Sequence, residues 1–224
     1  MRRLSVILGN ERGNVTVFTL SVFFVMLLIL FTALFNFSTV FVVKEQASNS
    51  AQQAALAAIK PIYDEMEDAI EEYDRSPNRL KDSILLGPIV DQTEDAIRAS
   101  HPDWAKSEVR YEAIDQVFSS WLPANIELLG YVQSGLAKAN AKVNGVVIRI
   151  LEANHATLAG SKVVFTSDDR IEVQTSVRFR STTFDFDFMP EIKHEEEVYQ
   201  TGQSRQIGFL DAVPGWSLPP IILL

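Results

Sequence analysis

A stretch of about 30 residues, from Asn14 to Val43, contains no charged residue and constrains this chain more than any other feature. It reads NVTVFTLSVFFVMLLILFTALFNFSTVFVV, and most of its side chains are large and apolar. A helix needs about 20 predominantly apolar residues to cross the hydrocarbon core of a bilayer, which is about 30 Å thick. The stretch exceeds that length and leaves room for a tilt. The sequence therefore predicts that residues 14–43 form a transmembrane helix.

Two other interpretations of this stretch are weaker. Buried helices of soluble proteins seldom run for this length without a charge. A cleaved secretory signal has an apolar core of about 7–15 residues, which is followed by a cleavage site with small side chains. Phe35, Phe37 and Phe41 stand where those small residues would have to be. We therefore expect the segment to stay attached to the rest of the chain.

The charges beside the apolar stretch predict its orientation. Residues 1–13 include Arg2, Arg3 and Arg12, whereas Lys44 on the far side is followed at once by Glu45. Positive charge next to a membrane-spanning helix stays on the cytoplasmic side. We expect a single-pass protein of the cell membrane, with residues 1–13 as a basic cytoplasmic leader and the C-terminal domain extracytoplasmic.

Net charge and composition exclude some classes of partner and some kinds of site for that domain. The whole chain carries a net charge of −9 and residues 1–43 carry +2, so −11 remains for residues 44–224. Nucleic-acid binding needs clustered lysine and arginine that neutralise phosphates, so we expect no nucleic-acid partner. The chain has no cysteine, which excludes disulfides, thiolate metal sites and a cysteine nucleophile.

Small side chains repeat at helical spacing after Lys44, in a segment that predicts a continuation of the helix. They are Ala47, Ala51, Ala54, Ala55 and Ala58. Because alanine lets neighbouring backbones approach closely, we expect helix–helix packing on this face. Within the apolar stretch, Asn36 carries an amide that needs a hydrogen-bond partner. Two interpretations stay open: Asn36 is hydrated near the outer interface, or it contacts another helix of an assembly.

The remaining chain is predicted to be helical first and β-stranded later. Helical periodicity covers residues 63–73, 91–99, 103–121 and 124–140, with an irregular connection over 80–90. Asp103 is in position to cap the third of these helices, and the many acidic residues of the first predict a solvated face. β-Branched or alternating residues predict strands over 143–152, 161–166, 170–181, 184–188 and 192–206.

This order predicts an α+β fold. A long N-terminal transmembrane helix extends into an extracytoplasmic helical region at 44–142, and a small antiparallel β-sheet follows at 143–210. The apolar C-terminal tail, residues 211–224, is too short to span a membrane and contains prolines. We expect it to pack on the domain or against a neighbour.

Residues that could carry chemistry are scattered and lack the spacing of known sites. The three histidines, His101, His155 and His194, are far apart in the sequence, which predicts surface residues rather than metal ligands. The carboxylate pairs at 168–169 and at 185 and 187 fall in a turn and on the polar side of a strand, where they favour solubility. We expect no enzymatic activity, no cofactor, no metal and no small-molecule substrate.

The residues around the start of the apolar stretch resemble a known family. The run ERGNVTVF at 11–18, the long apolar helix and the segment QASNSAQQAALAA at 46–58 are similar to the N-termini of TadE/TadG-like proteins. These are pilin-like components of the tight-adherence (Flp) pilus assembly system. The resemblance implies cleavage by a prepilin peptidase between Gly13 and Asn14. Phe18 stands five residues after Gly13, where the family has a glutamate.

The resemblance implies a non-enzymatic, single-pass component of a Tad/Flp-type pilus or secretion assembly, as a minor pilin or a pseudopilin-like protein. Its expected partners are the membrane and other pilin-like or pilus-assembly membrane proteins. The alternative hypothesis is a single-span extracytoplasmic binding or sensor subunit that signals through a membrane partner.

Overall fold

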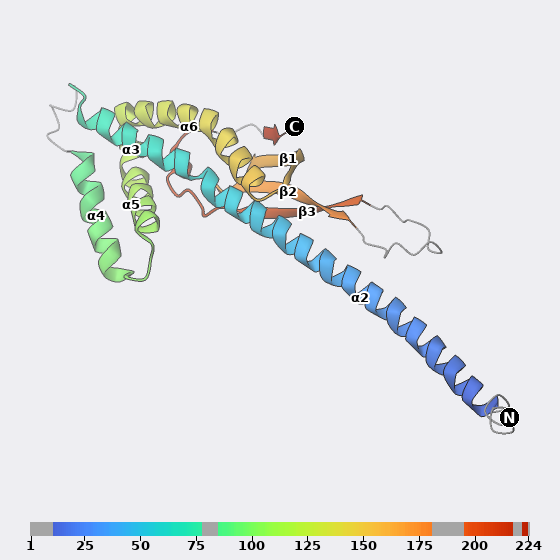
Figure 1. The fold of residues 1–224 in the computed structure, drawn as a ribbon. Helices are drawn as coiled ribbons and strands as arrows, with labels where there is room; N and C mark the ends of the chain where they lie inside the picture. The colour runs from blue at the N-terminus through green and yellow to red at the C-terminus, as the bar shows by residue number, and fades with distance from the viewer. Residues whose placement is uncertain (1–10, 78–84, 181–194, 217–220, 224) are drawn as a thin grey trace. The chain divides into compact units, whose positions relative to one another are not determined.

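The computed structural model of the chain describes residues 11–77, 85–180, 195–216 and 221–223. Helices occupy most of the first two thirds and strands follow (Figure 1). The apolar part of the first helix, up to Val43, belongs to one unit of the chain, and residues 44–178 and 197–224 form a second unit, the domain. The helices are α2 (Glu11–Ala58), α3 (Lys60–Asp74), α4 (Leu86–Ser100), α5 (Lys106–Trp121) and α6 (Ile126–Ala153), with short 3-10 turns at Leu122–Ala124 and Leu210–Ala212.

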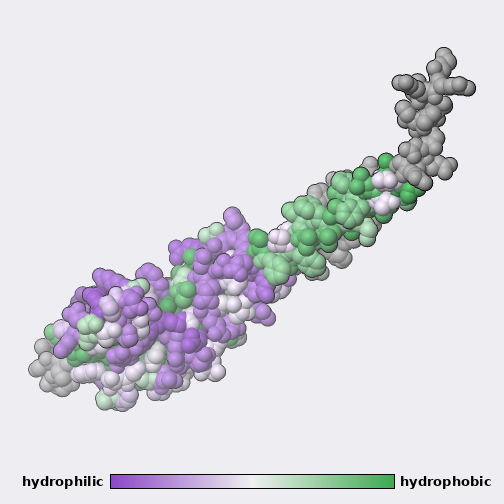
Figure 2. Space-filling view, turned by 90° about the horizontal axis from the view of Figure 1, so that it is seen from below, coloured by the Kyte–Doolittle hydropathy of each residue, from purple (hydrophilic) through white to green (hydrophobic). Residues whose placement is uncertain are grey.

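The apolar part of α2 exposes large hydrophobic side chains around its whole circumference. Phe18, Leu20 and Phe41, for example, are each about two-thirds exposed, and apolar residues dominate the surface of this segment (Figure 2). In the part of the chain that the structure describes, it is the one helix long and apolar enough to cross a membrane, with a mean hydropathy of 2.7. Exposed hydrocarbon of this extent is stable only in an apolar solvent.

Polar side chains within this segment bond back to their own helix. The hydroxyl of Thr19 donates to the carbonyl of Val15 at 2.9 Å, and that of Thr32 donates to the carbonyl of Leu28 at 2.8 Å. The hydroxyls of Ser21 and Thr39 likewise donate to carbonyl oxygens one turn earlier in the helix. These bonds satisfy the hydroxyls without water, so the serines and threonines do not oppose an apolar environment.

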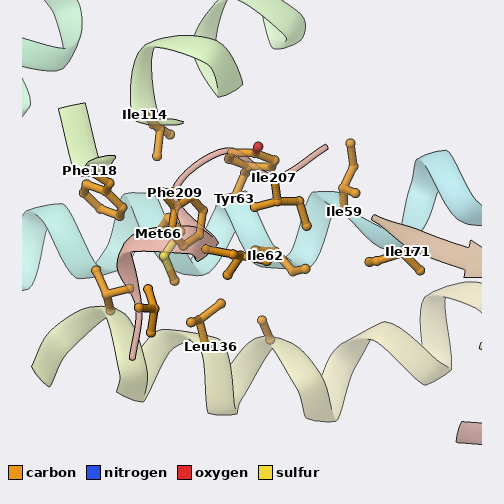
Figure 3. Close-up of a cluster of buried hydrophobic side chains, with 14 of the residues drawn as sticks. Ile59, Ile62, Tyr63, Met66, Ile114, Phe118, Leu136, Ile171, Ile207 and Phe209 are labelled. Carbon is orange, nitrogen blue, oxygen red and sulfur yellow. The ribbon is translucent and has the colours of Figure 1, made fainter. Parts of the chain in front are cut away.

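The core of the domain lies where α3, α5, α6 and the segment after strand β3 (Glu195–Gln203) converge (Figure 3). Tyr63 and Met66 of α3 meet Phe118 of α5, Leu136 of α6 and Phe209, all with 1% exposure or less. The rings of Phe118 and Phe209 meet edge to face with centroids 5.4 Å apart. The periodic apolar positions predicted for these helices therefore face a common interior.

The sheet contains β1 (Thr157–Phe165), β2 (Ile171–Arg180), β3 (Glu195–Gln203) and β4 (Ile221–Leu223), in the order β3-β2-β1-β4. β1 is antiparallel to both β2 and β4, and Val163 lies opposite Val173. A bulge interrupts β1 between Thr157 and Lys162, where Gly160 has a φ of 77°. Residues 167–169 form the predicted turn between β1 and β2, with Asp169 at a φ of 56°. The α+β fold, with helices before a small antiparallel sheet, is confirmed.

The strand predicted over 143–152 is wrong, because α6 continues to Ala153. Val143, Val147 and Leu151 recur every four residues, and all three have 0% exposure. The β-branched composition of this segment favours a strand, but the burial of this apolar row in the core of the domain overrides that propensity. The helical region of the domain is therefore longer than predicted.

Two predicted helix starts are also wrong. α4 begins at Leu86 despite Gly87 and Pro88, because the Asp74 carboxylate accepts the backbone N–H groups of Leu86 at 2.8 Å and Gly87 at 2.9 Å. A proline in the first turn loses no intrahelical hydrogen bond. α5 begins after Ala105, which makes no side-chain cap, so Asp103 is not its N-cap.

The end of the chain is part of the sheet. The backbone of Ile221–Leu223 pairs with Ser161, Lys162 and Val163 of β1, and Val213 is 4% exposed. The predicted packing of the tail on the domain is confirmed for these residues. The strand predicted over 184–188 lies outside the described residues.

Candidate functional site

In the described apolar part of α2, Asn36 is the residue with a buried side-chain polar atom that lacks a hydrogen-bond partner. The Oδ1 atom of Asn36 is buried and has no hydrogen-bond partner among the described residues. An amide oxygen in an apolar setting costs free energy until it accepts a hydrogen bond. A hydrogen-bond donor from outside the helix would therefore stabilise Asn36 in an apolar setting.

Gly13 and Asn14 lie in the first turn of α2, which begins at Glu11. The candidate span begins directly after them, at Val15. The peptide bond between Gly13 and Asn14 thus lies at the boundary between the polar and the apolar part of the helix.

The alanine face that follows Lys44 is covered by the chain's own domain. Each of the five alanines has 0% exposure. Gln46 and Gln53 bond to Asn154 at the end of α6, at 3.2 and 3.0 Å. Gln52 donates to the carbonyl of Gln203 at 2.8 Å and accepts from its N–H at 3.2 Å.

The close approach of β3 explains why this face is small. A β-carbon added to Gly202 would stand 2.5 Å from the carbonyl oxygen of Ala51. Backbone meets backbone here, which only glycine and alanine permit. The five alanines therefore pack against residues of the same chain.

The acidic face of α3 is solvated at most of its carboxylates, as predicted, and Glu65 is the buried exception. Glu65 is 3% exposed and pairs with Lys142 of α6. Glu67 pairs with Arg110 of α5 at 3.0 Å, and Glu72 pairs with Lys138 at 3.3 Å. Several carboxylates of this helix thus join α3 to its neighbours, although exposed pairs of this kind contribute little stability individually.

A buried polar cluster, formed by Tyr63, Asp115 and Arg205, lies beside the core. The Tyr63 hydroxyl lies 2.8 and 2.9 Å from the two carboxylate oxygens of Asp115, to which it donates. Arg205 donates to Asp115 at 3.0 Å and to Glu112 at 2.7 Å. The ring of Tyr63 stacks on that of Tyr111 with centroids 4.0 Å apart. The cluster ties the segment after β3 to α3 and α5.

Burial raises the pKa of two carboxylates, Asp115 and Asp169, and of the Tyr63 hydroxyl. It raises the pKa of Asp115 to about 6, although Arg205, Tyr63 and the Gly208 N–H all favour the charged form. Burial and the nearby Asp115 charge raise the pKa of Tyr63. Burial and a hydrogen bond with Asp211 raise the pKa of Asp169 to about 6. These groups connect different parts of the domain, and their hydrogen-bond and ion-pair partners belong to the same chain.

An open cavity of about 690 Å³ adjoins the cluster and is lined by Trp104, Glu108 and Arg170 among others. In the described part of the chain, no group of three or more histidine or acidic residues could hold a metal ion. His101 is exposed and stacks on Trp104 at 4.2 Å, and His155 is exposed at the end of α6. His194 and the carboxylates at 185 and 187 lie outside the described residues. Asp168 pairs with Arg170 at 3.1 Å in the predicted turn.

Part of the chain matches a protein-family model. Residues 13–60 match the family described as "Putative Flp pilus-assembly TadE/G-like". This segment is TadE/G-like. No match is found among curated proteins or among solved structures.

The TadE/G-like segment coincides with α2 and the first residue of α3. It begins at Gly13, contains the apolar stretch with Asn36, and ends just after the last buried alanine. The resemblance stated from the sequence is confirmed over these residues, and it indicates a role related to Tad pili. The apolar helix and the match together fit membrane anchoring.

Sequence reasoning missed the Tyr63, Asp115 and Arg205 cluster. Its donors and acceptors lie 52 and 90 residues apart in the chain. One signal was present: Asp115 stands between Ile114 and Val117 on the apolar side of α5, where a lone carboxylate requires partners.

Proposed function

We propose that this protein is a non-enzymatic, single-pass component of a Tad/Flp-type pilus or secretion assembly, comparable to a minor pilin. The observation that carries the proposal is the coincidence of two features in one segment. Residues 13–60 match the pilus-assembly family, and the same residues include a helix whose large apolar side chains are exposed over the length of a membrane span.

The proposed topology places residues 1–13 in the cytoplasm and the domain outside. Arg2, Arg3 and Arg12 precede the span, whereas the part that follows is strongly acidic. Arginine close to a span resists translocation, while carboxylates contribute little to orientation.

Two positions of the span have proposed roles. A prepilin peptidase cuts between Gly13 and Asn14, at the polar-to-apolar boundary of α2. Asn36 contacts a helix of another pilin-like chain in the membrane, which would give its Oδ1 atom a hydrogen-bond donor. Thr32, whose hydroxyl already bonds to Leu28, has no such need.

Intact-mass measurement on the full chain, extracted from membranes of the organism that expresses it, tests the processing step. Loss of residues 1–13 supports prepilin-type cleavage, and retention of these residues contradicts it. Loss of everything up to about residue 45 would contradict the membrane anchor as well.

Co-purification from the same detergent extract tests the assembly role. We expect other single-span pilin-like chains and the secretion ATPase platform to be recovered with a C-terminally tagged copy. Repeated recovery of a monomer without these proteins would refute the proposal. Protease added to intact spheroplasts should digest the domain if it is extracytoplasmic and spare it if the orientation is reversed.

A further inference from the structure

The edge of the sheet at β1 is covered by β4 of the same chain. The strand order β3-β2-β1-β4 places β4 outermost, and its three residues pair with Ser161, Lys162 and Val163. β1 has nine residues, so among the described residues β4 pairs with three of these nine. Strands commonly contain about five or six residues. The contact that closes this edge of the sheet is therefore short.

The composition of β4 differs from that of the strand at the opposite edge. Ile221, Ile222 and Leu223 carry no charge, and isoleucine is a favoured residue in strands. Natural edge strands often carry charges that oppose pairing with another chain. β3 follows this rule, because it begins with three glutamates, and its Gly202 also lies against α2. Of the two outer strands, β4 is the one without a charged side chain.

The segment that leads to β4 is held on the domain just before the strand. Val213 is 4% exposed, and the ring of Trp216 meets that of Phe165 edge to face with centroids 4.9 Å apart. Four residues, 217–220, then separate Trp216 from β4. An extended connection of this length reaches roughly 15 Å, which is about three times the spacing of neighbouring strands. This reach is sufficient for β4 to cross to the β1 edge of an adjacent copy.

We infer that β4 exchanges between copies of this chain, so that Ile221–Leu223 of one copy pairs with the β1 edge of a second copy. The exchanged strand forms the same residue pairs as it does within one chain, so exchange sacrifices no contact of β4. Both the binding edge and the strand that binds it are therefore present in this sequence. The inference rests on the proposed assembly role, because assembly holds copies side by side, and it deepens that role by stating that one partner is a second copy.

Disulfide trapping between single-cysteine chains tests the inference, because the natural chain has no cysteine. Lys162→Cys in one copy and Ile222→Cys in the other mark positions that lie opposite one another in the β1–β4 pair. The α-carbons of opposed residues in an antiparallel pair are about 4.5–5.5 Å apart, which is within the range of a disulfide. Each chain carries one thiol, so a disulfide between positions 162 and 222 joins two different copies.

The two full-length variants are produced together, oxidised in native membranes with copper phenanthroline and digested, and the linked peptides are quantified by tandem mass spectrometry. Lys162→Cys with Gln174→Cys is the matched control, because these residues lie opposite one another in the β1–β2 pair. The turn at 167–169 joins β1 directly to β2, so this pair stays within one chain. The mixture that tests β4 should give at least about tenfold more intermolecular disulfide than the control mixture.

A chain that carries both Lys162→Cys and Ile222→Cys reports whether the substitutions preserve the β1–β4 pair. It should form the disulfide on oxidation, since the two positions are opposed within the single chain as well as after exchange. If it forms no disulfide, β4 does not pair with β1 and the inference is overturned.

Equal yields from the test and control mixtures would also overturn the inference, because random collision between copies gives that result. So would a disulfide in the double-cysteine chain with none in the test mixture. In either case the proposed function stands if pilin-like chains still co-purify with the natural protein. Trapped exchange without recovery of pilus-assembly proteins would support exchange and contradict the proposed function.

Discussion

Gly202→Ala should destabilise the domain, because it inserts a methyl group where β3 meets the backbone of α2. The new β-carbon would stand 2.5 Å from the carbonyl oxygen of Ala51, and the amide nitrogen of Gln52 is also in its way. These neighbours are backbone atoms, so no side-chain rotation relieves the clash. Overpacking of this kind costs about 1–3 kcal/mol of unfolding free energy.

The expected change in melting temperature follows from the size of the domain. In a chain of this size, 1 kcal/mol corresponds to about 2–4 °C, so Gly202→Ala should lower Tm by roughly 2–12 °C. Thermal unfolding of the full chain in a mild detergent, followed by circular dichroism, measures this shift. Hydrogen exchange gives a local readout, because the Gln203 N–H that donates to Gln52 should exchange faster in the variant.

Gly130→Ala is the matched control. A β-carbon at Gly130 meets nothing within 4 Å, and the residue lies within α6. Alanine is favoured over glycine inside a helix by about 0.5–1 kcal/mol, so this variant should melt slightly higher than the natural chain. A Gly202→Ala chain that melts at or above the natural temperature would refute the close approach of β3 to α2.

Three further changes have defined outcomes. Tyr63→Phe should lower the unfolding free energy by about 1.5–3 kcal/mol in a denaturant titration, since the buried Asp115 carboxylate loses a donor; unchanged stability would contradict this bond. The pKa of Asp115 is about 6 in the folded domain and its ordinary value is 3.8, so the folded state binds a proton that the unfolded state releases between those values. Stability from this group should therefore rise by about 2 kcal/mol as the pH falls from 6 to 4, and the Tm difference between the natural chain and Asp115→Asn should move in favour of the natural chain; a difference independent of pH would be the contrary result. Asn36→Leu should reduce recovery of membrane partners about threefold or more without changing the Tm of the domain, whereas Thr32→Val should leave recovery unchanged; equal recovery in both would remove the proposed role of Asn36.

The elements that the sequence predicts well are those in which one physical requirement dominates. The apolar part of α2 is recognisable because a membrane span needs length and the absence of charge, and both are local properties. β2 is recognisable because Ile171, Val173, Thr175 and Val177 alternate with polar residues, and all four are buried. In these segments, propensity and periodicity agree.

α6 shows why the prediction fails where two local signals disagree. Its second half contains Val143, Val146, Val147, Ile148 and Ile150, which favour a strand by composition. Spacing favours a helix, because a four-residue repeat places one apolar row on one side. Packing into the core of the domain decides the outcome, and the partner surface cannot be seen within a short window of sequence.

The polar clusters show a second limit. Asp74 supports the start of α4 across a connection of more than ten residues, and Arg205 reaches Asp115 from 90 residues away. A sequence reveals that a carboxylate on an apolar helix face needs partners, but not which residues the fold brings to it. Contacts of this kind are properties of the topology.

The two parts of α2 illustrate how one helix can meet two opposite requirements. Before Lys44 its side chains are large and exposed, because the free energy gained in an apolar solvent grows with the area that each side chain contributes. After Lys44 they are small and buried, because β3 must lie against the helix backbone at Ala51. Large side chains after Lys44 would prevent β3 from approaching the helix at Gly202. Alanines before Lys44 would offer little apolar area to lipid. Side-chain size and polarity therefore both change at Lys44, and together they separate the exposed apolar part of the helix from the part that supports the domain.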